Sequence, residues 1–213
     1  MHDRLTMTAV PQDARGIVIM LHGGAERSEK PVDHRSLSLR RSRRMFDVIS
    51  GDLTSAGLAV GLLRFVVKGW NAVPGGVPAP VRDARTAIRD VHAEHPDLPI
   101  LLLGHSMGAR TAARVADEPG VVGVVGLAPW FPADDPVDAL AGKHLVAAHG
   151  QRDRITSPKA SRVFVERASA AGAEARYVDM GNLGHYMLAG ARRWNAIAVT
   201  ESLGVLDRVS PAR

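Results

Sequence analysis

The sequence predicts an α/β domain with a mostly parallel sheet of about seven strands. Short apolar runs alternate along the chain with segments of helical character, which is the order expected of strand–helix–strand units. Most runs contain few polar residues, as expected of strands that helices cover on both faces; they are residues 16–21, 58–65, 100–103, 121–127, 143–149 and 175–180. The segments that read as helices are residues 42–56, 81–95, 109–116, 157–171 and 187–203.

The first strand of the predicted sheet has a different pattern. Residues 4–10 alternate between apolar and polar side chains, which is typical of a half-exposed edge strand. A turn over residues 11–16 separates this strand from the continuous apolar run at 16–21. The two segments together predict an antiparallel hairpin at one edge of the sheet.

The length and composition bound the class of protein. With 213 residues the chain can bury a substantial core, and we expect one domain over residues 1–213. It contains no cysteine, which excludes disulfides and thiolate chemistry. No apolar run approaches the length of about 18 residues that a membrane span needs, and the N-terminus lacks the apolar core of a signal peptide. We therefore expect no membrane span and a cytoplasmic location.

The positive charge is concentrated in one segment. The net charge is +5, and residues 35–44 contain five arginines and no acid. Such a segment is either a phosphate- or carboxylate-binding patch or a solvated loop and first helical turn. Aromatic residues make up only 4% of the chain and none lies in the segment, so base stacking has no support. We expect no nucleic-acid partner.

One motif carries chemistry. Gly104-His105-Ser106-Met107-Gly108 matches G-x-S-x-G between an apolar run and a helical segment, the context in which this motif holds a nucleophilic serine. The strand-to-helix turn would project the hydroxyl of Ser106 above the sheet. The N–H of Met107, at the start of the helix, would point to where an oxyanion forms.

A second motif indicates a family. The apolar run at 16–21 ends in His22-Gly23-Gly24, ahead of the G-x-S-x-G strand. With these two motifs in this order the chain resembles the α/β-hydrolases, specifically small carboxylesterases and dienelactone-hydrolase-like proteins. The resemblance implies the α/β-hydrolase fold, with one antiparallel edge strand and helices on both faces. It also implies that Gly24, or alternatively Ala25, supplies the second N–H of an oxyanion hole.

The rest of the chain extends this resemblance. His149-Gly150-x-x-Asp153-x-x-x-x-Pro158 looks like the family's acid loop, and His185 lies in a loop after the last strand, where the family has its catalytic histidine. The resemblance thus implies catalytic roles for Ser106, Asp153 and His185. Asp134 and Asp135 remain alternatives for the acid. We expect His22 and His149 to be structural, and the side chain of His105 to point away from the serine hydroxyl.

Two loops are candidates for the walls of a substrate pocket. Trp70 follows the strand at 58–65, and Trp130 and Phe131 follow the strand at 121–127, where parallel sheets place their ligands. Packing within the loops is the alternative for all three rings. Only about a dozen residues separate the strand at 121–127 from the next one, so there is no room for the helical cap that many α/β-hydrolases carry here. An open site is expected.

The implied activity is serine hydrolysis of carboxylic esters with small or medium acyl groups, through an acyl-enzyme and without a cofactor or metal. Thioesterase, acyltransferase and cofactor-free perhydrolase activities share the same catalytic residues and are alternatives. A carrier-bound acyl substrate would give the arginines of residues 35–44 a use. A non-catalytic binding protein on this fold is the third possibility, because a fold does not fix a function. The expected partner is a small-molecule ester or thioester.

Overall fold

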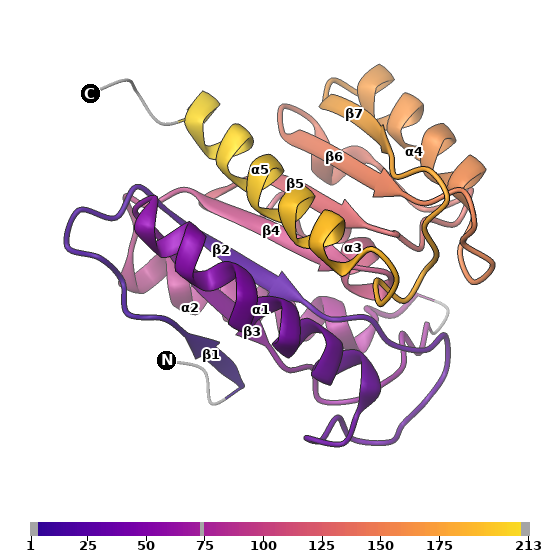
Figure 1. Ribbon diagram of the computed structural model, residues 1–213, viewed down its shortest axis with the longest axis horizontal. Coiled ribbons are helices and arrows are strands. Elements are labelled where there is room, and N and C mark those ends of the chain that lie inside the picture. Colours follow the sequence, from indigo (N-terminus) through magenta and orange to yellow (C-terminus); the bar gives the residue numbers. More distant parts are fainter. Residues whose placement is uncertain (1–3, 73–74, 210–213) are drawn as a thin grey trace.

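The computed structural model describes residues 4–72 and 75–209. Seven strands form one sheet in the order β1-β3-β2-β4-β5-β6-β7 (Figure 1). The strands are β1 (Leu5–Met7), β2 (Gly16–Leu21), β3 (Leu58–Leu63), β4 (Ile100–His105), β5 (Val121–Leu127), β6 (His144–His149) and β7 (Glu174–Asp179). The helices are α1 (Leu37–Ser55), α2 (Ala79–Glu94), α3 (Met107–Arg114), α4 (Pro158–Ala170) and α5 (Ala191–Val209), with a short 3-10 helix η1 at Asp138–Leu140.

Helices cover both faces of the sheet, as the apolar runs predict. The side chains of α1 and α5 pack on one face in a cluster with Val18, Val60 and Leu101. Those of α2, α3 and α4 pack on the other face with Ile17, Ile19 and others. In Figure 1, α1 and α5 cross the near face side by side. All residues of β2, β3 and β4 are buried, so these strands form the centre of the core.

The predicted hairpin at the N-terminus is wrong. β1 is antiparallel, as expected, but it pairs with β3, with Leu5 opposite Leu63, and not with β2. β2 lies between β3 and β4 and is parallel to both. Because both edges of β2 are taken by these neighbours, the edge strand adds to the remaining free edge of β3.

The parallel strands bring their carboxyl ends to one edge of the sheet. The segments that follow β2, β4, β5, β6 and β7 therefore converge there. Between β5 and β6 the chain forms only η1 and its flanking turns, so no cap domain covers this edge. No helix among the described residues has the length and apolarity needed to cross a membrane.

Candidate active site

Ser106 lies in the sharp turn between β4 and α3, at the carboxyl edge of the sheet. Its backbone has φ 53° and ψ −116°, in the positive-φ region that residues other than glycine seldom adopt. The N–H of Ser106 donates to the carbonyl of Leu127, and the N–H of Trp130 donates to the carbonyl of Ser106. The segment after β5 thus holds the serine in a strained conformation of the kind found at functional sites.

Glycines on both sides of Ser106 allow β4 and α3 to approach so closely. A Cβ atom on Gly104 would collide with the backbone of Ala109, and one on Gly108 with the carbonyl of Leu21 in β2. Backbone atoms cannot move aside as the end of a flexible side chain can. Both glycines of the G-x-S-x-G motif are therefore required by the contacts of the turn itself.

The structure brings Asp153 and His185 together. Asp153 lies in the turn after β6, and His185 lies in the loop between β7 and α5. The Nδ1 atom of His185 is 2.8 Å from Oδ2 of Asp153, and both side chains are almost completely buried. The alternative acids do not reach the histidine: Asp134 is exposed, and Asp135 forms a buried ion pair with Arg110.

Several donors hold the Asp153 carboxylate. The backbone N–H groups of Ile155 and Thr156 donate to Oδ1, each at 2.8 Å. Oδ2 accepts the Thr156 hydroxyl at 3.0 Å and lies 3.0 Å from Nε2 of His149. Burial raises the pKa of this carboxyl, but the hydrogen bonds from His149, His185, Thr156 and Ile155 outweigh burial and hold the pKa well below its usual value.

This low pKa fixes the arrangement of protons on His185. An ionised carboxylate accepts hydrogen bonds and donates none. His185 therefore donates to Asp153 from Nδ1, and a neutral imidazole then carries its lone pair on Nε2. That is the form in which a histidine can take a proton from a hydroxyl.

The sequence predicts only a structural role for His149 and does not indicate its contact with Asp153. Its Nδ1 atom is 2.8 Å from the hydroxyl of Ser161 in α4, so the ring connects α4 with the carboxylate. Thr156 also contacts both Asp153 and Nδ1 of His185. The four-residue spacing between His149 and Asp153 is the one signal that could have indicated this contact.

Two further histidines are buried and neutral near neutral pH. His22 donates from Nδ1 to the carbonyl of Gly23 and accepts the N–H of Phe65 on Nε2, which is a structural role. Burial lowers the pKa of His22 to about 4. Burial, followed by the neighbouring His185, lowers the pKa of His105 to about 3. The Nε2 atom of His105 bonds to the backbone carbonyl of His185, so its ring supports the loop that carries His185.

The loop after β2 lies against the start of α3. A Cβ atom on Gly24 would collide with the side chain of Met107, so the two residues are in close contact. The N–H of Ala25 already donates to the carbonyl of Lys68, at 2.8 Å. The N–H groups of Gly24 and Met107 make no hydrogen bond with any residue that the structure describes, and Gly24 is exposed.

The three candidate pocket residues have different environments. Phe131 is only 3% exposed and its ring stacks on Phe164 of α4, so it belongs to the core. The rings of Trp70 and Trp130 meet edge to face, and the guanidinium of Arg110 lies over both, 4.1 Å and 4.3 Å from the ring centres. Both tryptophans line a cavity of about 210 Å³. Neither Ser106 nor His185 lines this cavity, although the N–H of Trp130 donates to the carbonyl of Ser106.

Comparison with known proteins identifies the family. Residues 12–148, well over half of the chain, match the family described as Serine aminopeptidase, S33. The chain belongs to this family of α/β hydrolases. The match includes the serine turn and the loop after β2 and ends before Asp153 and His185. No curated protein sequence matches this chain.

Solved structures share the fold of this S33-family chain. An α/β serine hydrolase homologue from Coxiella burnetii has a TM-score of 0.66 at 19% identity, over 92% of this chain and 90% of that one. XC6422 from Xanthomonas campestris, a serine hydrolase without a lid, has a TM-score of 0.64 at 18% identity, and the match covers 98% of this chain and 90% of that one. The propionate-bound esterase Est2 from Thermogutta terrifontis has a TM-score of 0.71 at 17% identity, and the match covers 98% of this chain and 91% of that one. The predicted α/β-hydrolase fold without a large cap is thus confirmed.

Proposed function

We propose that this S33-family protein hydrolyses carboxylic esters of small or medium acyl groups, with Ser106, His185 and Asp153 as nucleophile, base and acid. The proposal rests on one observation. The buried 2.8 Å contact between His185 and the ionised Asp153 occurs at the same sheet edge as the strained turn of Ser106. These are the three groups, in the chain order, that activate a serine in α/β-hydrolases.

In the first half of the proposed reaction, the Ser106 hydroxyl attacks the ester carbonyl. A serine hydroxyl is a weak nucleophile, so His185 takes its proton on Nε2 during the attack. Asp153 keeps the other ring nitrogen protonated and stabilises the imidazolium that forms. His185 then gives the proton to the departing alcohol, which leaves the acyl group on Ser106.

The tetrahedral intermediate carries a negative oxygen that needs hydrogen-bond donors. The backbone N–H groups of Gly24 and Met107 are suited to this role, because neither bonds to a described residue and the two residues are in contact. The Ala25 alternative is disfavoured, because its N–H is already bonded to Lys68. Removing one such donor typically costs about 10²–10³ in rate.

In the second half of the reaction, water attacks the acyl-enzyme with His185 again as base. The products are the free acid and the original serine, so the cycle balances without a cofactor. The structural neighbour Est2 has propionate bound, which is in line with a small acyl group.

A series of p-nitrophenyl esters, from acetate to palmitate, tests the proposal with the wild type and Ser106→Ala. We expect turnover with an optimum at a short or medium chain length, lost in the variant, and labelling of the wild type by a fluorophosphonate. The same acids as thioesters, and amino-acid p-nitroanilides, measure the thioesterase and peptidase alternatives. Absence of labelling, or equal rates for both proteins, would exclude the catalytic proposal and favour a binding protein.

A further inference from the structure

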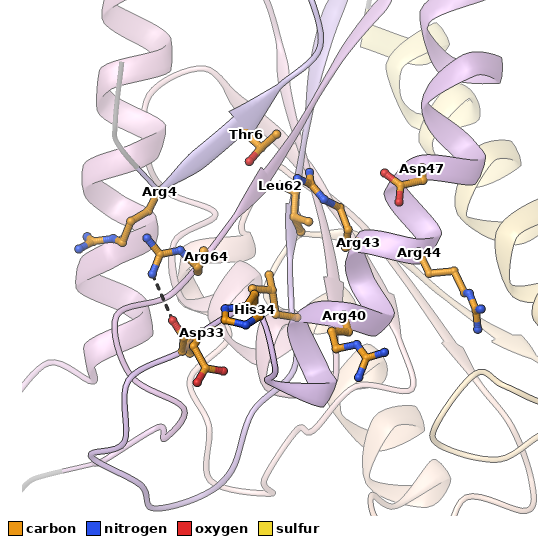
Figure 2. A pocket seen from close by; sticks show the side chains of 12 residues that line it. Arg4, Thr6, Asp33, His34, Arg40, Arg43, Arg44, Asp47, Leu62 and Arg64 are labelled. Carbon is orange, nitrogen blue, oxygen red and sulfur yellow. Dashed lines mark hydrogen bonds between the residues drawn. The ribbon is translucent and has the colours of Figure 1, made fainter.

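A groove separate from the serine turn lies between α1 and the β1–β3 edge of the sheet (Figure 2). Its volume is about 670 Å³, which is within the roughly 300–1,000 Å³ of small-molecule sites. Thr6 of β1 and Leu62 of β3 line one side, and α1 supplies the other. The groove is therefore bounded by regular secondary structure, which holds its walls in fixed positions.

Arginine dominates the lining. Five arginines and His34 line the groove, against two aspartates; the arginines are Arg4, Arg40, Arg43, Arg44 and Arg64. In Figure 2, Arg43 reaches from α1 toward Leu62, Arg64 lies on the opposite side, and His34 lies between them. Arg40 and Arg44 project from α1 away from Leu62 in this view. Arg43 and Arg64 thus contribute positive charge from two sides of the groove.

Arg4 forms an ion pair with Asp83, but the three arginines that α1 contributes to the groove have no carboxylate partner among the described residues. No ion pair or side-chain hydrogen bond with a described residue involves the guanidinium groups of Arg40, Arg43 and Arg44, and Arg64 donates to the backbone carbonyl of Val32. Of the two aspartates, Asp33 accepts hydrogen bonds from Ser36 and from a backbone N–H.

Arginines elsewhere in the fold contrast with this group. Arg89, Arg110 and Arg176 each pair with a buried carboxylate; the partners are Glu118, Asp135 and Glu201. Clustered like charges repel one another, so Arg40, Arg43 and Arg44, which have no carboxylate partner among the described residues, are stabilised when an anion binds among them. The missing partner of the groove is therefore anionic.

We propose that this groove binds a small molecule with two or more phosphate groups. Guanidinium groups match phosphate oxygens in paired hydrogen bonds, and one phosphate carries up to two charges. No Phe, Tyr or Trp side chain lines the groove, so a nucleobase finds none of these larger rings on which to stack. The recognised part of the ligand is thus its phosphates. The fourth arginine that the 35–44 segment contributes to α1, Arg41, lies over the ring of Tyr186 and does not line the groove.

A membrane surface is a less suitable partner. A helix that lies on a bilayer needs a continuous apolar face beside its basic one. On α1 the exposed large apolar residues are Leu37 and Val48, separated by three turns of mostly charged or buried residues. A discrete phosphorylated molecule fits the groove better.

Calorimetric titration of the full-length protein with pyrophosphate at low ionic strength tests the proposal. We expect one saturable site, and at least about tenfold weaker binding by Arg43→Gln, because a charge-assisted pair is lost. Arg192→Gln is the matched control. It removes the same charge from an exposed arginine in the first turn of α5, outside the groove. It should bind pyrophosphate as the wild type does.

No saturable binding by the wild type would overturn the proposal, as would equal weakening in both variants, which would indicate general charge attraction. Vesicles of phosphatidylglycerol and a short RNA serve as competing partners. If either binds and pyrophosphate does not displace it, the site belongs to that partner and the proposal fails. Ester turnover is measured on the same samples, so that a failure of anion binding can be told apart from a failure of the proposed ester hydrolysis.

Discussion

The Nε2 atom of His149 lies 3.0 Å from Oδ2 of Asp153, and both side chains are completely buried. The same oxygen is 2.8 Å from Nδ1 of His185. His149 also contacts Ser161, so its ring links α4 to the proposed catalytic acid. The Oδ2 atom of Asp153 is thus held by two histidines.

Replacing His149 with alanine should therefore slow the reaction. Without this donor the Asp153 carboxylate can rotate, and His185 spends less time in its productive orientation. The loss of one charged hydrogen bond, about 1.4 kcal/mol, corresponds to a roughly tenfold lower kcat with KM little changed. Ser161→Ala is the control, since it leaves the contact with Asp153 in place. Steady-state kinetics measure both; equal losses in the two variants would contradict a role in positioning.

Asp153→Asn tests the acid directly. An asparagine can donate a hydrogen bond to Nδ1 of His185 and so favour the tautomer that cannot accept the serine proton. In enzymes with this arrangement the change costs roughly 10³–10⁴ in kcat. Asp134→Asn removes an exposed carboxylate in a nearby loop and should leave kcat unchanged. Ester hydrolysis by the two purified variants is the measurement, and comparable rates would assign the acid elsewhere.

The sequence predicted the strands of the sheet well for a physical reason. A strand covered on both faces has to be apolar throughout, so β2 to β6 are visible as runs, and Ser106, Asp153 and His185 lie just after strand ends. The partner of β1 was not predictable, since alternation indicates an edge strand but not which edge it joins. The hydrogen bonds of Thr156 and Ser161 depend on how loops fold together.

The helix α1 illustrates another limit. Its predicted start at residue 42 follows the apolar spacing, but the helix begins at Leu37. The intervening residues are exposed or half-exposed and rich in arginine, so they leave no apolar period in the sequence. Arginine nevertheless has a high helix propensity, and that tendency extends the helix beyond its buried face.

Gly51→Ala should stabilise the protein. Gly51 lies in the interior of α1, is exposed, and a Cβ atom placed there meets no atom within 4 Å. Alanine loses less backbone entropy on folding, so we expect a gain of about 0.5–1 kcal/mol in the free energy of unfolding. Urea denaturation measures it. Gly108→Ala is the opposite case, because the added atom collides with the backbone of β2, and it should be strongly destabilised.

Stability should fall between neutral pH and pH 5, in part through His22. Burial lowers the pKa of His22 from 6.5 to about 4. Between these two pH values His22 is protonated in the unfolded chain but stays neutral in the folded protein. The stability is fully present above pH 6.5 and is lost as the pH falls towards 4. From pH 7 to pH 5 the free energy of unfolding contributed by this residue falls by about 2 kcal/mol.

His22→Gln can still accept the N–H of Phe65 but does not titrate. Urea denaturation at both pH values should show that the free energy of unfolding falls by about 2 kcal/mol less in the variant than in the wild type. Part of the fall that remains in the variant comes from His105. Equal losses in both proteins would mean that His22 is protonated in the folded state.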